Sequence, residues 1–168
     1  MDCIQCGSPF EPASGHCPQC GWDPDAKHGE LAGYRPGELV RGRYEVDRPL
    51  GAGRLGVVFC AIDLETDAEV AVKVVHPALV PDEQVGRRFL RSMRPLVRAG
   101  HAYMNRVLDV NCEGDRYFVV YALLDGAPLR DVLESRRARG RGFTVAEALP
   151  VFEQIAALTV EADVAVHG

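Results

Sequence analysis

Three glycines spaced as G-x-G-x-x-G stand between two stretches of strand-forming residues. They are Gly51, Gly53 and Gly56 in the segment GAGRLGVV. The spacing alone is a weak signal, because it also occurs where a strand runs directly into a helix. Here the residues that follow, VVFCAIDL, are β-branched and aromatic, which favours a second strand. The sequence therefore predicts a hairpin with the glycines at its tip.

A lysine lies in the next predicted strand, AEVAVKVV. Only Lys27 and Lys73 are lysines among the 19 basic residues, so the composition would favour arginine at a position where any cation would serve. A glycine-rich hairpin can present backbone N–H groups to phosphates, and a cation on a neighbouring strand can hold those phosphates. Lys73 is therefore a candidate phosphate ligand beneath the glycine loop.

The residues after this strand predict a helix and a second hairpin. Apolar residues in PDEQVGRRFLRSMRPLVRAG recur at intervals of three and four, which predicts one amphipathic helix that begins after Pro81 and ends at Gly100. The segment RVLDVNCEGDRYFVVYALLDG predicts a hairpin whose turn lies at residues 113–115.

Two further helices are predicted towards the end of the sequence. A short one begins near Pro128, in PLRDVLESRRA. A longer one follows in TVAEALPVFEQIAALTVEADVAV, where Thr144 and Glu147 have the spacing of a capping box. Pro150 is expected to kink this longer helix, because proline removes a backbone donor.

In this order the segments resemble the amino-terminal lobe of bacterial eukaryotic-type Ser/Thr protein kinases. RYEVDRPLGAGRLGVVFCAIDLETDAEVAVKVV is similar to the first three strands of that lobe, and FLRSMRPLVRAGHAYMNRVLDV to its αC helix and fourth strand. RYFVVYALLDGAPLRDVL is similar to the fifth strand, hinge and αD, and TVAEALPVFEQIAAL to αE. The resemblance covers residues 41–168 and implies an α+β fold, with a five-stranded antiparallel sheet, αC, and the αD and αE helices.

The resemblance also implies a nucleotide site for ATP with Mg2+. According to this resemblance, four apolar residues line the adenine pocket and Tyr121 occupies the gatekeeper position. The glycine loop and the strand lysine hold the phosphates. The same apolar residues would be buried as ordinary core in any such sheet. The implied residues are Leu50, Gly51, Gly53, Gly56, Val58, Ala71, Lys73, Tyr121 and Leu123.

The sequence departs from the family pattern at the partner of the lysine. In the family a glutamate on αC pairs with the strand lysine, and the corresponding residue here is Ser92. The nearest acid, Glu83, lies nine residues earlier, and Pro95 is expected to bend or strain the helix just beyond Ser92. The usual hinge glutamate is Ala122. The pairing that orders an active kinase is therefore predicted to be missing.

The catalytic parts of the family pattern are also missing from the 168 residues. The sequence ends at VAVHG, where the catalytic loop H-R-D-x-x-x-x-N would begin, and it contains no D-F-G. Phosphoryl transfer needs those carboxylates to hold Mg2+ and orient the hydroxyl. We therefore expect a kinase-like, pseudokinase regulatory or scaffold module that binds protein partners and ATP. The alternatives are the amino-terminal portion of an active Ser/Thr kinase and an interaction module that binds no nucleotide.

Four cysteines form two closely spaced pairs in the first twenty residues. Cys3, Cys6, Cys17 and Cys20 have the spacing C-x2-C-x10-C-x2-C, in which two turns can close a tetrahedron of thiolates around Zn2+. Two disulfides, or an iron site with similar turns, would use the same residues. The favoured prediction is a structural zinc ribbon at residues 1–22, followed by a linker at 23–40, and most of the ribbon's folding energy would come from the metal.

Charge and hydropathy narrow the classes of partner. The net charge is −5, and the first thirty residues hold five acids against one lysine. A nucleic-acid reader needs a cationic face to displace counterions, so no nucleic-acid partner is expected for this segment. No run of 18 apolar residues and no secretory leader is present, which predicts a cytoplasmic protein without a membrane span.

Overall fold

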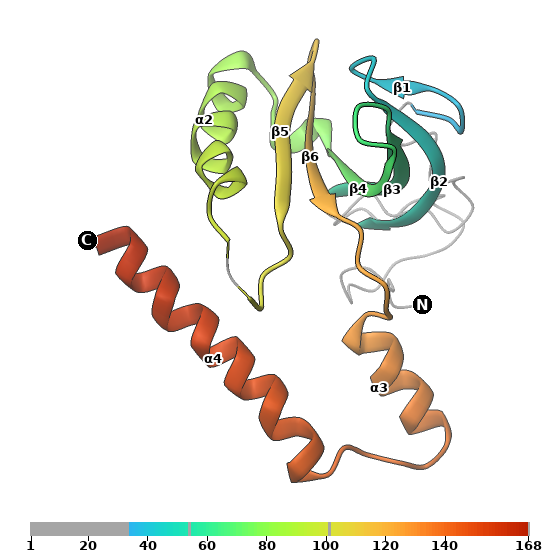
Figure 1. Cartoon of the computed structure of the whole chain (residues 1–168), viewed down its shortest axis with the longest axis vertical. Coiled ribbons are helices and arrows are strands. Elements are labelled where there is room, and N and C mark those ends of the chain that lie inside the picture. The colour runs from blue at the N-terminus through green and yellow to red at the C-terminus, as the bar shows by residue number, and fades with distance from the viewer. Residues whose placement is uncertain (1–33, 54, 101, 168) are drawn as a thin grey trace. The chain divides into compact units, whose positions relative to one another are not determined.

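The computed structural model describes residues 34–53, 55–100 and 102–167, with side chains as far as residue 157. The described chain divides into two units, drawn as ribbons in Figure 1. One unit holds a sheet and a helix, in residues 34–99 and 106–123. The other holds residues 100–105 and 124–167, with two helices. The four cysteines of the predicted zinc ribbon lie outside the described residues.

The sheet has six strands, all paired antiparallel, in the order β1-β2-β3-β4-β6-β5. Five of them correspond to the strands of the kinase-like lobe, and the sixth, β1, is a two-residue strand that the sequence did not predict. The second hairpin turns at Gly114 and Asp115, within the predicted turn. The strands are β1 Leu39–Val40, β2 Tyr44–Gly53, β3 Gly56–Asp63, β4 Ala68–Val75, β5 Val107–Glu113 and β6 Arg116–Ala122.

One face of the sheet carries the main hydrophobic core. Residues alternate between the two faces of a strand, and on β3 and β4 every second residue is part of one buried cluster. Phe59 of β3, Val72 of β4 and Phe118 of β6 have no exposed surface. The buried cluster consists of Tyr34, Val40, Tyr44, Val46, Val57, Phe59, Ala61, Val70, Val72, Val74, Phe118 and Val120.

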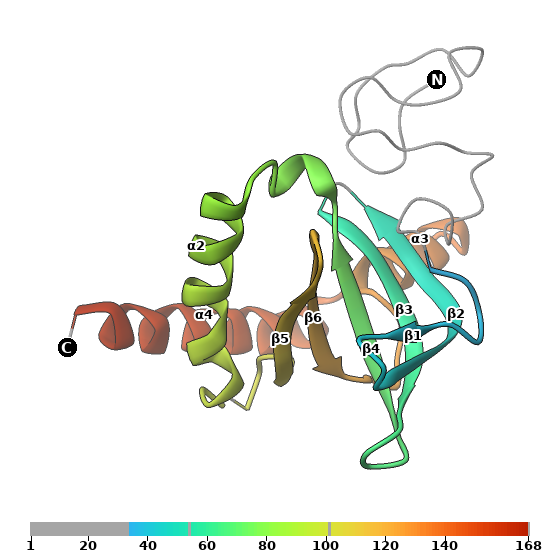
Figure 2. The ribbon, with the colours of Figure 1, turned by 90° about the horizontal axis from the view of Figure 1, so that it is seen from above.

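Long-range hydrogen bonds show that the sheet curls upon itself. The Tyr44 hydroxyl on β2 donates to Asp109 Oδ2 on β5 at 3.0 Å, although four positions in the strand order separate these strands. The hydroxyl of Tyr34, which is 3% exposed, donates to Glu113 Oε2 at the end of β5 at 2.7 Å. Figure 2 shows the sheet from above, with β1 at its edge beside β2. The core of the lobe therefore reaches back to Tyr34, inside the stretch predicted as a linker.

A partly buried ion pair joins the residue before β2 to the end of β3. The Arg43 guanidinium donates from Nε and Nη2 to the two carboxylate oxygens of Asp63, both at 2.8 Å. Asp63 is 4% exposed, and it also accepts from the Thr66 hydroxyl at 3.0 Å. The guanidinium lowers the pKa of Asp63 to about 2. This carboxylate therefore organises the turn between β3 and β4 as well as the strand pairing.

The predicted helix at 81–100 is shorter and divided. Asp82 caps its N-terminus by accepting from the Val85 backbone at 2.9 Å, and α2 spans Glu83–Met93. A 3-10 turn, η3, follows at Arg94–Val97. Pro95 has no N–H to donate to Arg91 and its ring crowds the preceding turn, which accounts for the end of the α-helix. Another short 3-10 turn, η2, spans Pro77–Leu79.

The second unit contains α3, Leu129–Ala138, and α4, Val145–His167. The capping box predicted from sequence is present, since Glu147 N donates to Thr144 Oγ1 at 3.3 Å and Thr144 N donates to Glu147 Oε2 at 3.0 Å. The helix continues through Pro150, in its second turn. No helix among the described residues has an apolar stretch long enough to cross a membrane.

Candidate functional site

The register of the sheet brings the predicted phosphate ligands onto one face. Lys73 on β4 pairs with Val58 on β3, and Val58 pairs in turn with Gly51 on β2. Two residues earlier on β4, Ala71 pairs with Tyr121 on β6. Since alternate residues share a face, these five residues lie opposite the main core. The predicted site residues therefore lie on the face of the sheet opposite the main core.

A hollow of about 360 Å³ lies beneath the glycine loop. The loop joins β2 to β3 at the pair formed by Gly53 and Gly56, and Lys73 lies on the strand next to it. Ala52 and Leu55, which were not predicted as site residues, also line the hollow. Both residues lie between the first and third glycines of the motif, and this position could have identified them as part of the site. The lining residues are Gly51, Ala52, Gly53, Leu55, Gly56, Val58 and Lys73.

Lys73 is half-buried in this hollow. Burial lowers the pKa of its ammonium, because a low-dielectric environment disfavours the charged form. Among the described residues no carboxylate forms an ion pair with Lys73. An ammonium held in this way gains energy from any anion that enters the hollow, and phosphate oxygens are suitable partners.

The third glycine of the motif has a structural task. Gly56 is buried and has φ +143°, a conformation that side-chain-bearing residues rarely adopt. A Cβ at this position would lie 1.9 Å from the carbonyl oxygen of Val74 on β4. Gly51 differs, because a Cβ there would meet no atom within 4 Å. Gly56 therefore permits the close approach of β3 to β4, whereas Gly51 leaves space open at the hollow.

The predicted adenine-side residues are divided between buried and exposed positions. Ala71 is 8% exposed and faces Tyr121 across the strands, and burial raises the pKa of the Tyr121 hydroxyl. Leu123 is half-buried just after β6, and Leu50 is 42% exposed on β2. None of these four lines the hollow under the glycine loop.

Cys60 belongs to the same face and was missed by sequence reasoning. It pairs with Ala71 across β3 and β4, and it has no exposed surface. Burial raises the pKa of its thiol, which makes the neutral form dominant. The signal that could have identified it is the two-residue alternation along β3 from Val58.

Ser92 lies in the last turn of α2 and is exposed. The apolar side of that helix, including Phe89 and Met93, packs against Val107 and Val110 of β5. The helix is thus held beside the sheet as αC is in the kinase lobe, but it brings no carboxylate to Lys73. No cluster of His, Cys, Asp or Glu suited to a metal occurs in the part of the chain that the structure describes.

Comparisons with known proteins agree with this architecture. Residues 44–161 match the family described as protein tyrosine and serine/threonine kinase. The serine/threonine-protein kinase pkn2 of Myxococcus xanthus is 33% identical over 119 residues, which cover 70% of this chain and 14% of that protein. The kinase PkaA of Streptomyces coelicolor is 35% identical over 140 residues, covering 76% of this chain and 25% of the relative.

Solved structures show the same similarity. The kinase domain of PknI from Mycobacterium tuberculosis superposes with a TM-score of 0.66 and 25% identity, over 73% of this chain and 49% of that one. A curled sheet with an αC-like helix and a lysine beneath a glycine hairpin defines a protein-kinase amino-terminal lobe. The chain belongs to the protein tyrosine and serine/threonine kinase family. It spans less than a third of the curated relatives reported above, and about half of the PknI domain.

Proposed function

We propose that the sheet unit binds ATP, with the glycine loop and Lys73 on its phosphates. The observation that carries the proposal is the position of Lys73, half-buried in the hollow under the loop and without a carboxylate partner among the described residues. Burial without a counter-charge is costly for an ammonium, and triphosphate oxygens would supply that charge. The adenine would lie against Ala71 and Tyr121, towards Leu123.

Mg2+ fits this proposal as a companion of the triphosphate. Magnesium keeps most of its waters and is held by few carboxylates together with substrate phosphates. The residues that line the hollow include no carboxylate. The phosphates of the nucleotide, together with water, would therefore bind Mg2+, because no described residue of the hollow supplies a carboxylate. Lys73 would neutralise part of the phosphate charge.

We further propose that the module is regulatory or scaffolding, a pseudokinase lobe that binds protein partners. The support is Ser92, which stands where the family has the carboxylate that holds the strand lysine. The alternative, the amino-terminal portion of an active Ser/Thr kinase, is supported by the kinases that the chain resembles. In that case a carboxylate elsewhere would have to replace the missing one. A third alternative is an interaction module that binds no nucleotide.

Thermal unfolding with nucleotide tests ATP binding. Mg-ATP at about 100 times its Kd would stabilise the folded chain by about 2.7 kcal/mol, which is a rise in Tm of about 5–11 °C for a chain of this length. Lys73→Met should abolish the rise. Lys27→Met is a matched control, because Lys27 is the other lysine of the chain, and it should leave the rise intact. An unchanged Tm at millimolar Mg-ATP would support the nucleotide-independent alternative instead.

Phosphoryl transfer distinguishes the regulatory module from the active kinase. The longest natural polypeptide that contains this sequence is incubated with radiolabelled ATP and general kinase substrates. No incorporation above that of its Lys73→Met variant supports the regulatory function. Incorporation that Lys73→Met eliminates would establish the active-kinase alternative.

We also propose that Cys3, Cys6, Cys17 and Cys20 hold one structural Zn2+. The support is the chemistry and spacing of the four thiols. Zinc–thiolate sites need reduced cysteines, which is consistent with a cytoplasmic location. Metal analysis should give one zinc per chain, and Cys17→Ser should lower that ratio. A full complement of zinc in the serine variant would contradict the assignment.

A further inference from the structure

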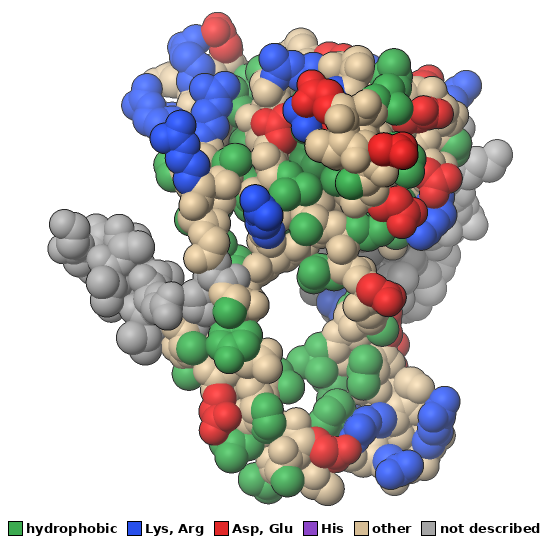
Figure 3. Space-filling model, in the orientation of Figure 1, with side chains coloured by type: hydrophobic (Ala, Val, Ile, Leu, Met, Phe, Trp, Pro, Cys, Tyr) green, Lys and Arg blue, Asp and Glu red, His purple; other side chains and the backbone are tan. Residues whose placement is uncertain are grey.

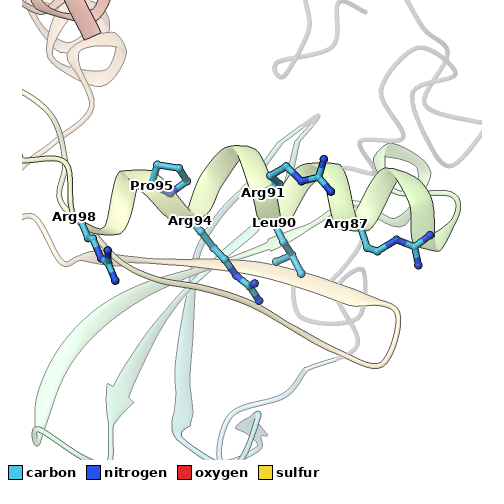
Figure 4. Close-up of a pocket in the computed structure, with 6 residues that line it drawn as sticks. All are labelled: Arg87, Leu90, Arg91, Arg94, Pro95 and Arg98. Carbon is cyan, nitrogen blue, oxygen red and sulfur yellow. The ribbon is translucent and has the colours of Figure 1, made fainter. Parts of the chain in front are cut away.

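Four arginines follow one side of α2 and η3. Arg87, Arg91, Arg94 and Arg98 are separated by four, three and four residues, the intervals that place side chains on one side of a helix. Together with Leu90 and Pro95 they line a surface hollow of about 790 Å³. Figure 4 shows the guanidinium groups spaced along the ribbon from one end to the other. We call this set of four residues the arginine strip.

The charge of the arginine strip is largely uncompensated. All four arginines are exposed, and within the described residues Arg87 is the one that has an acidic partner, Glu83, at 2.5 Å in the same helix. Among the described residues no carboxylate pairs with Arg91, Arg94 or Arg98. Figure 3 shows the basic side chains gathered over α2. Like charges at these intervals destabilise a helix by a few tenths of a kcal/mol per pair, so the strip would gain energy from an anionic partner.

The arginine strip is held on a rigid support. The other side of the helix packs against the sheet through Phe89 and Met93, and the Phe89 ring meets Tyr117 edge to face at 5.9 Å. This packing fixes the backbone from which the four arginine side chains extend. A guanidinium group can bind a carboxylate with two parallel hydrogen bonds, so the arginine strip is suited to an acidic polypeptide.

The first thirty residues of the chain are acidic, with five acids and one lysine. This stretch joins the described lobe at Tyr34. The Tyr34 hydroxyl donates to Glu113 at the end of β5, the strand against which α2 and η3 pack. The ten residues 24–33 can extend by at most about 35 Å, and a lobe of about 85 residues has a radius of gyration of about 12 Å. The acidic stretch is therefore within reach of the arginine strip.

We propose that the arginine strip is a docking surface for the acidic residues 1–30 of the same chain. Charge complementarity favours this occupant over a nucleic acid or an anionic membrane, because the chain carries a net charge of −5 that would repel either. The covalent link also raises the local concentration of the acidic stretch to the millimolar range. The contact is an electrostatic one between the amino-terminal module and the αC-like helix, and it does not depend on nucleotide binding.

Trp22 reports on this contact, because it is the only tryptophan of the chain and lies in the acidic stretch. Its fluorescence anisotropy in the full chain should fall when salt is raised from about 20 mM to about 500 mM, since screening shortens the range of the attraction. The triple variant Arg91→Glu/Arg94→Glu/Arg98→Glu should show the low value at every salt concentration. Far-UV circular dichroism verifies that the variant remains folded.

A matched control reverses three other arginines, in Arg137→Glu/Arg139→Glu/Arg141→Glu. This variant changes the net charge equally, at positions outside α2 and η3, and should keep the salt-dependent fall. Adding Asp23→Arg and Asp25→Arg to the triple strip variant should restore the high anisotropy at low salt. Three results would overturn the proposal: a wild-type anisotropy that salt does not change, a control that behaves like the strip variant, or no restoration by the reciprocal charges.

Soluble anions test the competing occupants of the arginine strip. Polyphosphate, single-stranded DNA and vesicles of anionic lipid are added to the full chain at low salt. If the acidic stretch occupies the strip, each ligand binds more weakly to the wild-type chain than to an Asp23→Asn/Asp25→Asn/Glu30→Gln variant. Equal binding to both proteins would show that the strip is free, which contradicts the proposal.

Discussion

Replacement of Gly56 by alanine should disrupt the close backbone contact between the start of β3 and β4. Gly56 has φ +143°, and the new Cβ would lie 1.9 Å from the carbonyl oxygen and 2.9 Å from the carbonyl carbon of Val74. A non-glycine residue in such a conformation costs about 1–3 kcal/mol. Overpacking against backbone, which cannot rotate away, adds about 1–3 kcal/mol.

One term opposes these costs. Alanine restricts the unfolded chain more than glycine does, which favours folding by about 0.4–1 kcal/mol. The net expectation for Gly56→Ala is a loss of about 2–5 kcal/mol in the free energy of unfolding. Because domains are stable by only about 5–15 kcal/mol, the variant should lie close to the limit of folding. Its Tm should fall by at least about 4 °C.

Urea unfolding followed by far-UV circular dichroism measures this loss. Gly51→Ala is the matched control, because it is a glycine of the same motif at which a Cβ would meet no atom within 4 Å. Its free energy of unfolding should stay within about 1 kcal/mol of the wild-type value. A Gly56→Ala variant as stable as Gly51→Ala would refute the structural role assigned to the third glycine.

Asp63 has a folded-state pKa of about 2, below the ordinary 3.8, so its stabilisation of about 2 kcal/mol should be present above about pH 4 and lost as pH falls towards 2. Arg43→Met should remove that pH dependence from urea unfolding, and a retained dependence would contradict the ion pair's role. Gly86→Ala should destabilise the chain despite a gain of about 1 kcal/mol in helix propensity, because the Cβ would lie 1.9 Å from the Tyr117 hydroxyl. In a Tyr117→Ala background, Gly86→Ala should no longer lower the free energy of unfolding, because the ring that it would clash with is absent. Additive effects of the two substitutions would argue against the clash. Thr144→Ala should lower helicity measured by circular dichroism, whereas Thr144→Ser should not, since only alanine loses the cap to the backbone N–H of residue 147.

Local patterns were sufficient to predict most elements of the lobe. Runs of strand-forming residues predicted β3 and β4, and the turn at Gly114 was predicted within its segment. The capping box at Thr144 was also confirmed. These features depend on residues a few positions apart, whose geometry the chain specifies without help from distant segments. The end of α2 was predicted less well, since Pro95 indicated strain but not the 3-10 turn that follows Met93.

Features that depend on distant contacts were not predicted. Tyr34 was predicted to lie in a linker, but its hydroxyl donates to Glu113, 79 residues later, and its ring lies in the core. The same curling of the sheet brings Tyr44 to Asp109. No periodicity encodes such pairs, because they arise only when the whole sheet closes.

The sequence by itself determined the family, the strand and helix order, and the identity of the residues at the candidate site, because motif spacing and side-chain alternation are properties of the chain. Only the tertiary structure decided what surrounds those residues. It placed Lys73 in a hollow without a described carboxylate partner and assigned Gly56 to a close backbone contact. It also turned the arginine strip outwards, because packing against β5 chose which side of α2 is buried. Burial, clash and charge pairing are relations between distant segments, and they exist only once the sheet has formed.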